Sequence, residues 1–427
     1  MWRKIQCYMT LALLLMVALA DHHEGHDHGE HSADHHRHLH HGKNEPHPSY
    51  DGKDESCDKV SSHNADFAFA LYNKLSSHPD AKGKNIFFSP LSISMALSML
   101  ALGAKGETHS QIFNALGYSS LTEDQVNEAY EHLLHMVDHS QEAMLLEAGG
   151  NLAVREGFKP VNKFLKDLQH FYHGEALTVD FSNPEVAVQE VNNFIAKKTK
   201  DIITDMIKSL DEDTIMVLIN YIYFRGKWEK NFDIKHTHKA DFHVDENTKV
   251  TVDMMKRTGR YDFYEDRDNF TLVIKVPYKG NTSMLIVLPN EGKLDEVEKH
   301  LSKESLKYWQ DKFFKRNVRL FLPKFSISSF FSLGDTLTEM GIIDAFSNNA
   351  NFTGMSEAKL KASKVLHQAI LKVDEKGTEA SAATTIEIMP HSLPNTMNLN
   401  RPFLVFIVEE STRSIVFMGK ITNPTEH

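Results

Sequence analysis

Cysteine is almost absent from this sequence. Only Cys7 and Cys57 occur among its 427 residues, and Cys7 lies in a segment that we expect to be removed. An internal disulfide is therefore excluded from the mature chain. Cys57 would remain as a lone thiol that is free, capped or joined to another molecule. Without disulfides, stability must come from a large hydrophobic core.

Long hydrophobic runs are also missing after the first 20 residues, although a membrane-spanning helix needs about 20 apolar residues. The N-terminus combines the basic stretch MWRK with the short apolar stretch MTLALLLMVALA and the A-x-A site at Ala18–Ala20. This combination is typical of a secretory signal peptide. We therefore expect residues 1–20 to be cleaved and the mature protein to be secreted, extracellular and not attached to a membrane.

An excess of positive charge is missing too. Asp and Glu number 58 against 47 Lys and Arg, so the formal net charge is -11. Such a chain is not expected to bind nucleic acid or an acidic membrane surface. The predicted helix at 122–138, TEDQVNEAYEHLLHMVD, has an acidic exposed face, so a heparin-binding helix is not evident there.

Catalytic signatures are likewise missing. The sequence holds no G-x-S-x-G, no H-E-x-x-H, no P-loop and no dinucleotide-binding glycine motif. No spacing marks a nucleophile and its base. These absences favour a binding or inhibitory protein over an enzyme, and no cofactor is required by anything in the sequence.

Histidine is abundant in one place. Residues 21–50 hold 11 of the 26 histidines and almost no apolar side chains, so we expect residues 21–58 to form a disordered tail. Clustered imidazoles bind Zn²⁺ or Cu²⁺ well. A fixed site also needs defined geometry and second-shell partners. The two interpretations are a metal site and a solvated tail that binds metal only weakly, and the second is favoured.

Residues 59–427 have the pattern of a globular domain. Phe67, Leu71 and Leu75 recur at helical spacing, and Ser89-Pro90 and Asn183-Pro184 each mark a helix start. Strands are indicated at 216–224 and at 318–328, with hairpins turning at Gly280-Asn281 and near the C-terminus. Helices come mainly first and strands mainly last, which predicts an α+β domain.

Three N-x-[ST] sequons occur, at Asn269, Asn281 and Asn351. In a secreted chain these asparagines are expected glycan acceptors. Asn281 is the best placed because it lies at the predicted hairpin turn, whereas the motif at Asn423 is excluded by the proline that follows it.

The segment 375–394, EKGTEASAATTIEIMPHSLP, combines features of a loop and of a strand. From Thr378 onward, small or apolar residues alternate with a set that includes both glutamates, which is the period of a strand with one buried face. Gly377 before it can act as a hinge. On this local pattern alone, an ordinary edge strand followed by a loop remains open.

The end of this segment is more suited to a loop. Pro390 and Pro394 cannot donate ladder hydrogen bonds, and cleavage directly before proline is disfavoured. A protease cutting between the prolines is left with the bonds His391-Ser392 and Ser392-Leu393. The first offers the larger side chain to a specificity pocket.

Several motifs together resemble the serpin family. They are DEKGTEASAATTIEIMPHS, NIFFSPLSISMALSMLALGAKGET, INYIYFRGKWEKNF and RPFLVFIVEESTRSIVFMGKITNPT. The resemblance covers about residues 59–427 and leaves out the His-rich tail. It implies one domain of helices around three β-sheets, with an exposed reactive-centre loop. It also implies a monomer whose partner is a target serine protease that is trapped as a covalent acyl-enzyme when the cleaved loop inserts into the central sheet.

The resemblance implies roles for residues of the loop. Glu375, Lys376 and Gly377 correspond to the hinge, and Thr378 to the first inserting residue. The small residues Ala380, Ser381, Ala382 and Ala383 match inhibitory members, whereas bulky or charged residues there stall insertion in others. Counting along the loop as in inhibitory members places the reactive bond at His391-Ser392, in agreement with the prolines.

The resemblance also implies polar residues beneath and above the central sheet. Ser89, Ser92, Asn220 and His367 correspond to a shutter under the strands that part. Lys324 and Glu375 correspond to a salt bridge at the top of that sheet, near Trp228. For His367 the alternative of a satisfied core histidine stays open, and both can hold together.

His391 departs from the residues expected for an elastase-like target, because it is polar and ionises near pH 6.5. A chymotrypsin-like protease with a roomy pocket is the first expectation. Two other functions stay open: a non-inhibitory carrier of a small hydrophobic hormone, and a metal-binding plasma protein acting through the tail. The small-residue hinge argues against the carrier.

Overall fold

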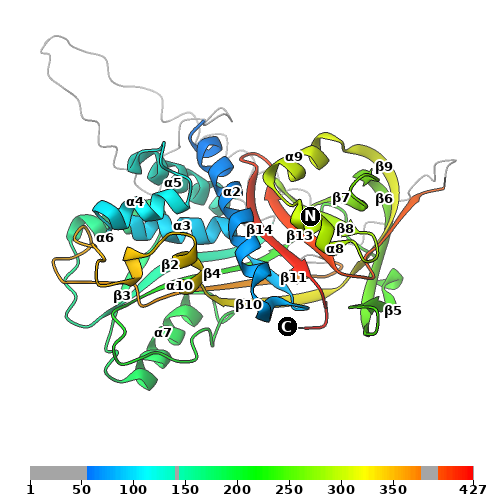
Figure 1. Cartoon of the computed structure of the whole chain (residues 1–427). Coiled ribbons are helices and arrows are strands. Elements are labelled where there is room, and N and C mark those ends of the chain that lie inside the picture. Colours follow the sequence, from blue (N-terminus) through cyan, green and yellow to red (C-terminus); the bar gives the residue numbers. More distant parts are fainter. Residues whose placement is uncertain (1–54, 140–143, 377–392, 427) are drawn as a thin grey trace, which may run out of the picture. The chain divides into compact units, whose positions relative to one another are not determined.

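The computed structural model describes residues 55–139, 144–376 and 393–426, which lie in one compact unit, Asp51–His427. The expected signal peptide and residues 21–54 of the His-rich tail lie outside the described residues. The helices of the described part are α2 (Glu55–Ser77), α3 (Pro90–Ala101), α4 (Gly106–Ala115), α5 (Glu123–His139), α6 (Asn162–Tyr172), α7 (Pro184–Lys198), α8 (Leu294–Lys299), α9 (Lys303–Asp311) and α10 (Gly334–Glu339) (Figure 1).

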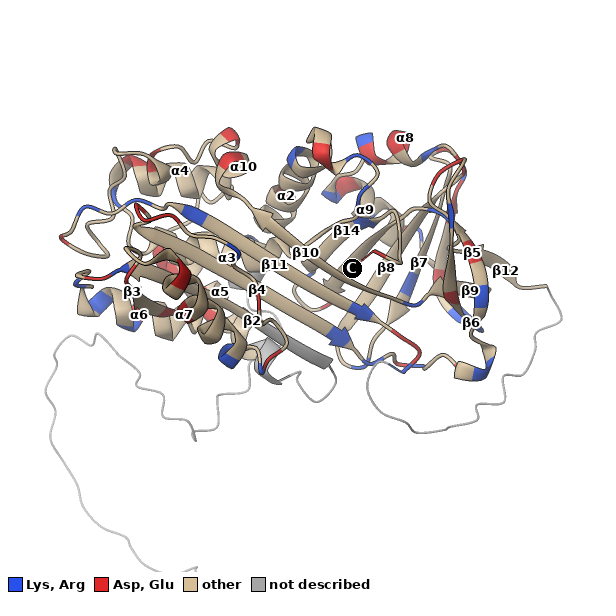
Figure 2. Ribbon diagram, turned by 90° about the horizontal axis from the view of Figure 1, so that it is seen from below, with Lys and Arg blue, Asp and Glu red and all other residues tan. Residues whose placement is uncertain are grey.

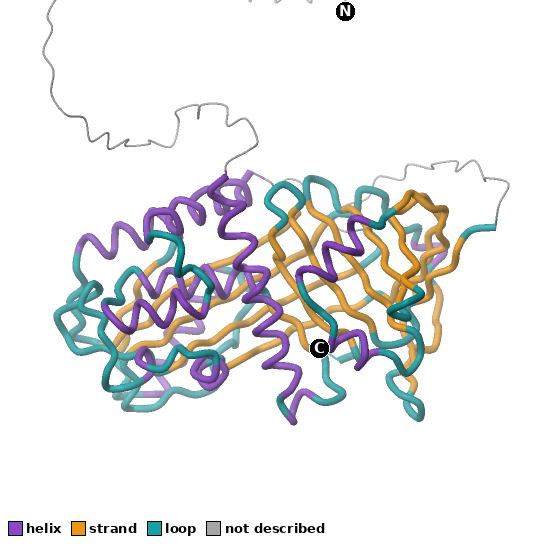
Figure 3. The backbone as a smooth tube through the Cα atoms, turned by 45° about the horizontal axis from the view of Figure 1, so that its top comes forward, coloured by secondary structure: helices purple, strands orange, loops and turns teal. Residues whose placement is uncertain are grey.

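The strands follow mainly after the first helices, as predicted. They are β1 (Ile86–Phe88), β2 (Met144–Arg155), β3 (Glu175–Val179), β4 (Met216–Gly226), β5 (His238–His243), β6 (Lys249–Asp266), β7 (Thr271–Pro277), β8 (Thr282–Pro289), β9 (Phe314–Pro323), β10 (Phe325–Ser332), β11 (Lys364–Val373), β12 (Asn395–Asn398), β13 (Phe403–Glu409) and β14 (Ser414–Ile421). In Figure 3 the strands run through the unit and most helical segments gather toward one end of it.

The boundary of the His-rich tail needs one correction. Helix α2 begins at Glu55, four residues before the predicted domain start at residue 59. The prediction of this helix rested on the apolar spacing of Phe67, Leu71 and Leu75, which are buried and lie well after Glu55. The first helical turn therefore carries no periodic pattern that sequence reasoning could use.

The strands pair into two sheets. The smaller has the order β10-β11-β4-β2-β3, and the larger runs from β1 through β14, β13, β8, β7, β6 and β9 to β12, with β5 paired to β6. The predicted α+β class is confirmed, but hydrogen bonding joins the described strands into two sheets rather than three. Strand β6 joins what would otherwise be two sheets, because it is 18 residues long. Its residues 249–263 pair with β5 and β9, and its residues 262–266 pair with β7.

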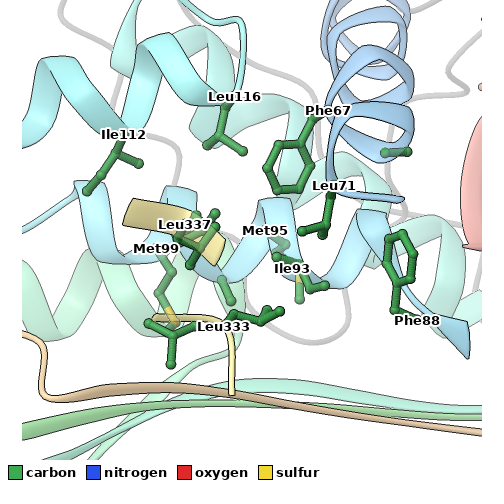
Figure 4. Packing of buried hydrophobic residues seen from close by; sticks show 14 of the residues in the cluster. Phe67, Leu71, Phe88, Ile93, Met95, Met99, Ile112, Leu116, Leu333 and Leu337 are labelled. Atoms are coloured by element: carbon green, nitrogen blue, oxygen red, sulfur yellow. The ribbon is translucent and has the colours of Figure 1, made fainter. Parts of the chain in front are cut away.

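Three apolar clusters hold the sheets in place. One joins the helices to one face of the five-stranded sheet, and Figure 4 shows its side chains from α2, α3, α4 and α10 pointing toward one another. A second fills the space between the two sheets. A third packs α7 against the opposite face of the five-stranded sheet. Strand β4, buried along nearly its whole length, is therefore covered on both faces, as its continuous apolar run predicted.

Helix α3 reaches the centre of the molecule because of how it starts. The hydroxyl of Ser89 accepts a hydrogen bond from the backbone N–H of Ser92, and Pro90 occupies the first turn, as the sequence predicted. All but one of its residues are buried, since the helix is apolar on every side. Its N-terminal turn thus lies directly under β4 and β11.

The strand predicted at 318–328 is in fact two strands in different sheets. β9 ends at Pro323 and β10 begins at Phe325. Pro323 cannot donate to a ladder, and the N–H of Lys324 binds the carbonyl of Asp253 instead. Lys324 is thereby held at the junction of the sheets, which is where the candidate site lies.

Candidate functional site

Strands β11 and β4 meet in a parallel pairing at the middle of the five-stranded sheet. The register runs from Lys364 opposite Val217 to Leu371 opposite Phe224. The next strands outward, β10 and β2, are antiparallel to β11 and β4. We call the β11–β4 contact the parallel seam.

Four predicted polar residues meet under this seam. The amide nitrogen of Asn220 donates to the hydroxyl of Ser92 over 2.7 Å, and the amide oxygen of Asn220 lies 2.6 Å from Nδ1 of His367. The backbone N–H of Ser89 donates to Nε2 of His367 over 3.1 Å. The hydroxyl of Ser89 donates to the carbonyl of Val416 over 2.6 Å. One buried network therefore connects α3, β4, β11 and β14.

The tautomer of His367 follows from these contacts. A backbone N–H can only donate, so Nε2 of His367 is unprotonated and Nδ1 carries the proton given to Asn220. The ring is fully buried, and desolvation lowers the pKa of His367 from 6.5 to about 3. His367 is thus a satisfied core histidine that is also part of the predicted cluster.

A second group of contacts closes the top of the seam. The indole N–H of Trp228 donates to the carbonyl of Asp374 over 2.8 Å, and the guanidinium of Arg225 binds the Asp374 carboxylate over 2.8 Å. The ring of Trp228 stacks on Tyr278 at a centroid distance of 4.3 Å. These contacts fix the chain where it leaves β11.

Glu375, the next residue, is held from three sides. Its carboxylate lies 3.0 Å from Nζ of Lys324 and accepts a 3.0 Å hydrogen bond from the hydroxyl of Thr237. Its carbonyl accepts from the N–H of Phe232. Burial disfavours the charged form, but the hydrogen bond to its own backbone N–H, Lys324 and Thr237 together lower the pKa of the Glu375 carboxyl.

The Lys324–Glu375 pair is only half-buried, although a buried pair was expected. The side chain of Glu375 is 6% exposed and that of Lys324 is 42% exposed. Lys324 is exposed at the position directly after β9. Water screens one side of the pair, so its strength lies below that of a fully buried ion pair.

Several supporting residues were not predicted. Arg225 and Asp374 pair across the ends of β4 and β11, and opposite charges at the ends of two adjacent strands are a signal that sequence reasoning could have used. Thr237 and Phe232 lie on the segment after Trp228 and approach Glu375 only through the fold. No local pattern marks them.

The hinge and loop are described only in part. The N–H of Lys376 donates to the Asp374 carboxylate over 3.1 Å, and its side chain is exposed. At the other end Leu393 is 96% exposed before β12. The predicted hinge residues Gly377, Thr378, Ala380, Ser381, Ala382 and Ala383, and the predicted reactive bond His391-Ser392, lie outside the described residues.

The three sequon asparagines are exposed at loops or turns. Asn269 precedes β7, Asn281 lies in the β7–β8 turn, and Asn351 follows η3 (Asp344–Phe346). Gly280 adopts a φ of +86° in that turn. Glycan attachment at these residues stays a prediction, and their exposure is compatible with it.

The described residues show neither a membrane-length apolar helix nor a group of three or more metal-ligating side chains. The predicted metal binding by the tail concerns residues that the structure does not describe.

The family model described as Serpin (serine protease inhibitor) matches residues 62–424. The chain belongs to the serpin family. The carp (Cyprinus carpio) alpha-1-antitrypsin homolog is 62% identical over 323 residues, which are 75% of this chain and 87% of that protein. Sheep (Ovis aries) alpha-1-antiproteinase is 40% identical over 377 residues, which are 88% of this chain and 90% of that protein.

A solved serpin structure gives the same fold. Human thyroxine-binding globulin in complex with thyroxine superposes with a TM-score of 0.82 at 39% identity, covering 87% of this chain and 100% of that chain. The family resemblance inferred from the motifs is therefore confirmed.

The Lys324–Glu375 contact gives the first prediction. Glu375→Lys would place a second ammonium group beside Lys324 and remove the carboxylate that accepts the hydrogen bond from Thr237. We expect this change to destabilise the closed seam by about 3 kcal/mol, which is the lower end of the range for leaving a buried charge unpaired. We expect the variant to polymerise on mild heating, seen as ladders on native gels. Glu229→Lys, the same charge change at an exposed neighbour, is the control. A monomeric Glu375→Lys band would contradict the prediction.

The buried imidazole gives the second prediction. The pKa of His367 is about 3 in the folded chain and about 6.5 unfolded, so the unfolded state binds more protons between these values. Stability is full above pH 6.5 and falls as the pH drops toward 3, by about 2 kcal/mol between pH 7.5 and pH 5. In urea titrations at both pH values, the difference between wild type and His367→Gln should shrink by that amount. An unchanged difference would contradict the assignment.

Proposed function

We propose that this chain is a secreted, monomeric, non-enzymatic inhibitor that traps a serine protease as a covalent complex. In this proposal residues 1–20 direct secretion, residues from 21 to the start of α2 form a tail, and the remainder is the inhibitory domain. The glycan acceptors are Asn269, Asn281 and Asn351.

The observation that carries the proposal is the parallel seam. The chain leaves β11 at Asp374–Glu375, so a segment that folds back along β11 runs antiparallel to it. Because β4 is parallel to β11, the same segment is antiparallel to β4 as well. Inserted between them, it replaces one parallel ladder by two antiparallel ladders, which are slightly more stable per residue.

The length of the loop and its composition support insertion. Residues 378–389 could run beside the ten residues of β11. Their alternation of small or apolar residues with the set that includes Glu379 and Glu387 suits a strand that is buried on one face. Opening the seam would break the contact between His367 and Asn220. The inserted strand would then offer new backbone hydrogen-bond partners to β11 and β4.

The covalent step follows ordinary acyl transfer. The serine hydroxyl of the protease adds to the carbonyl carbon of His391, and its proton passes through the protease base to the leaving amine of Ser392. The His391-Ser392 amide bond breaks and an ester forms between the protease serine and His391. Loop insertion then carries the ester away before water hydrolyses it, so the protease stays bound.

A carrier function remains the alternative, since a relative of similar fold is named for binding thyroxine. The small residues Ala380, Ala382 and Ala383 favour the inhibitor, because a carrier does not need a segment that fits inside a sheet. Metal binding through the tail would be a separate property, and Zn²⁺ titration of the chain with residues 22–47 deleted would locate it.

The inhibitor proposal predicts an SDS-stable complex with a serine protease of chymotrypsin-like specificity, with cleavage between His391 and Ser392 seen by mass spectrometry. Ala382→Arg would bury a charge on insertion, at several kcal/mol, and slow insertion by more than about tenfold. That variant should be cleaved as a substrate. Glu379→Arg, on the alternate face, should still inhibit. Equal loss in both variants would contradict the insertion mechanism.

His391 gives a further prediction. Its imidazole has an ordinary pKa of about 6.5, so about a tenth of it is neutral at pH 5.5. If the neutral ring enters the apolar pocket, the inhibition rate should fall about tenfold from pH 8 to pH 5.5 beyond any change in a His391→Phe control. The control removes the titration of the protease itself. A constant ratio of the two rates over this range would contradict the role of His391.

A further inference from the structure

The outer face of the sheet beside β12 carries basic side chains that the proposed inhibitory reaction does not use. β12 pairs with β9, with Asn395 opposite Val318 and Thr396 opposite Arg319. β9 pairs in turn with β6, with Arg260 opposite Asn317 and Thr258 opposite Arg319. Residues directly opposite each other share one face of a sheet, so these pairs define the two faces.

The inward face is mostly apolar and buried, although Arg257 and Arg316 lie on the same side of the strands. Tyr261 of β6, Val318 and Leu320 of β9, and Met397 of β12 are at most 1% exposed, and they belong to the cluster between the sheets. The residues between them in sequence therefore point outward. Among these, Arg260, Arg319 and Thr396 are exposed.

Basic residues dominate this outward face. In the paired stretches 256–262 and 315–321, the charged residues at outward positions are Lys256, Arg260, Asp262, Lys315 and Arg319. The one acidic residue among them, Asp262, already forms ion pairs with Lys315 at 3.1 Å and with Lys275 at 3.9 Å, and it has no ion pair with either arginine. Figure 2 shows the blue segments on β6 and β9 close to β12.

Arg260 and Arg319 have no acidic partner among the described residues. They occupy diagonal positions on neighbouring strands, about 7–8 Å apart, so their like charges repel. In a chain with a formal net charge of -11, these two arginines form a locally positive patch.

The position of this face points to its occupant. The proposed reactive bond ends at residue 392, three residues before Asn395, so an extended chain places it about 10 Å from the start of β12. That separation is about one Debye length at 0.1 M salt. A protease holding the loop would therefore lie over β12 and β9, with its own surface facing Arg260 and Arg319.

We propose that Arg260 and Arg319 form a docking surface for carboxylates on the target protease, next to the subsites that bind the loop after the reactive bond. This inference rests on the proposed function. The arginines would attract the protease before the loop is engaged, and so raise the association rate for proteases with an acidic surface at that place. The protease pocket for residue 391 and this surface would then select the target together.

The test compares two double variants by the second-order rate of SDS-stable complex formation. Arg260→Gln with Arg319→Gln removes the surface. Lys82→Gln with Lys84→Gln removes two exposed charges beside β1, at the opposite edge of the same sheet. Chymotrypsin, trypsin and pancreatic elastase serve as probes, each at ionic strengths from about 0.02 to 0.5 M.

For the protease that wild type inhibits fastest, we expect the arginine variant to lose about tenfold in rate at the lowest ionic strength. The rate of the arginine variant should also lose most of its dependence on salt. The lysine variant should keep the wild-type rate and the wild-type salt dependence. Arg260→Glu with Arg319→Glu should reverse the sign of the salt dependence. All of these side chains are exposed, so thermal melting should be unchanged in every variant.

Equal rates and equal salt dependence in the two double variants would overturn the docking surface while leaving the inhibitor proposal intact. An effect seen only when a sulfated polysaccharide is added would assign the face to that polyanion and also overturn it. Failure of wild type to form a complex with any probe, with loop cleavage instead, would overturn the inhibitor proposal and the docking surface together.

Discussion

The parallel pairing of β11 with β4 is the constraint on which the rest of the structure depends. It is the place where a returning strand would gain an antiparallel neighbour on each side, and it is held at its middle and at its upper end. Asn220 and His367 hold it from below, and Arg225 and Trp228 hold Asp374 at its upper end. In the proposed mechanism, the side chains that secure the seam would have to release it when a strand enters.

The closing contacts differ in physical character. Under the seam the contacts are buried and neutral, and they depend on one proton at Nδ1 of His367. At its upper end they include the ion pairs Arg225–Asp374 and Lys324–Glu375, and the side chain of Lys324 is 42% exposed. The stability of the lower cluster therefore falls in acid, as His367 becomes protonated. The strength of the upper ion pairs falls with added salt and with charge-changing substitutions at Lys324 or Glu375. The contacts at the middle of the seam and those at its upper end can therefore be weakened independently.

The sequence predicted elements with strong local signals. The Ser89-Pro90 helix start, the buried strand at β4 and the turn at Gly280 are all found as expected, because each rests on neighbouring residues. It did not predict that 318–328 divides between two sheets, since Pro323 interrupts a pattern that otherwise looks continuous. The shutter residues came from a family resemblance. Thr237 and Phe232, which hold Glu375, approach it only in the folded chain.

The division of that segment has a mechanical consequence. A single residue, Lys324, separates β9 from β10, so the β10–β11 half of the five-stranded sheet is tethered to the nine-stranded sheet. On the other side, 11 residues connect β4 to β5. Widening the seam by one strand, about 4.8 Å, is absorbed more easily by the long connection. The tethered half would then act as a fixed frame, and β4, β2 and β3 would move as a block.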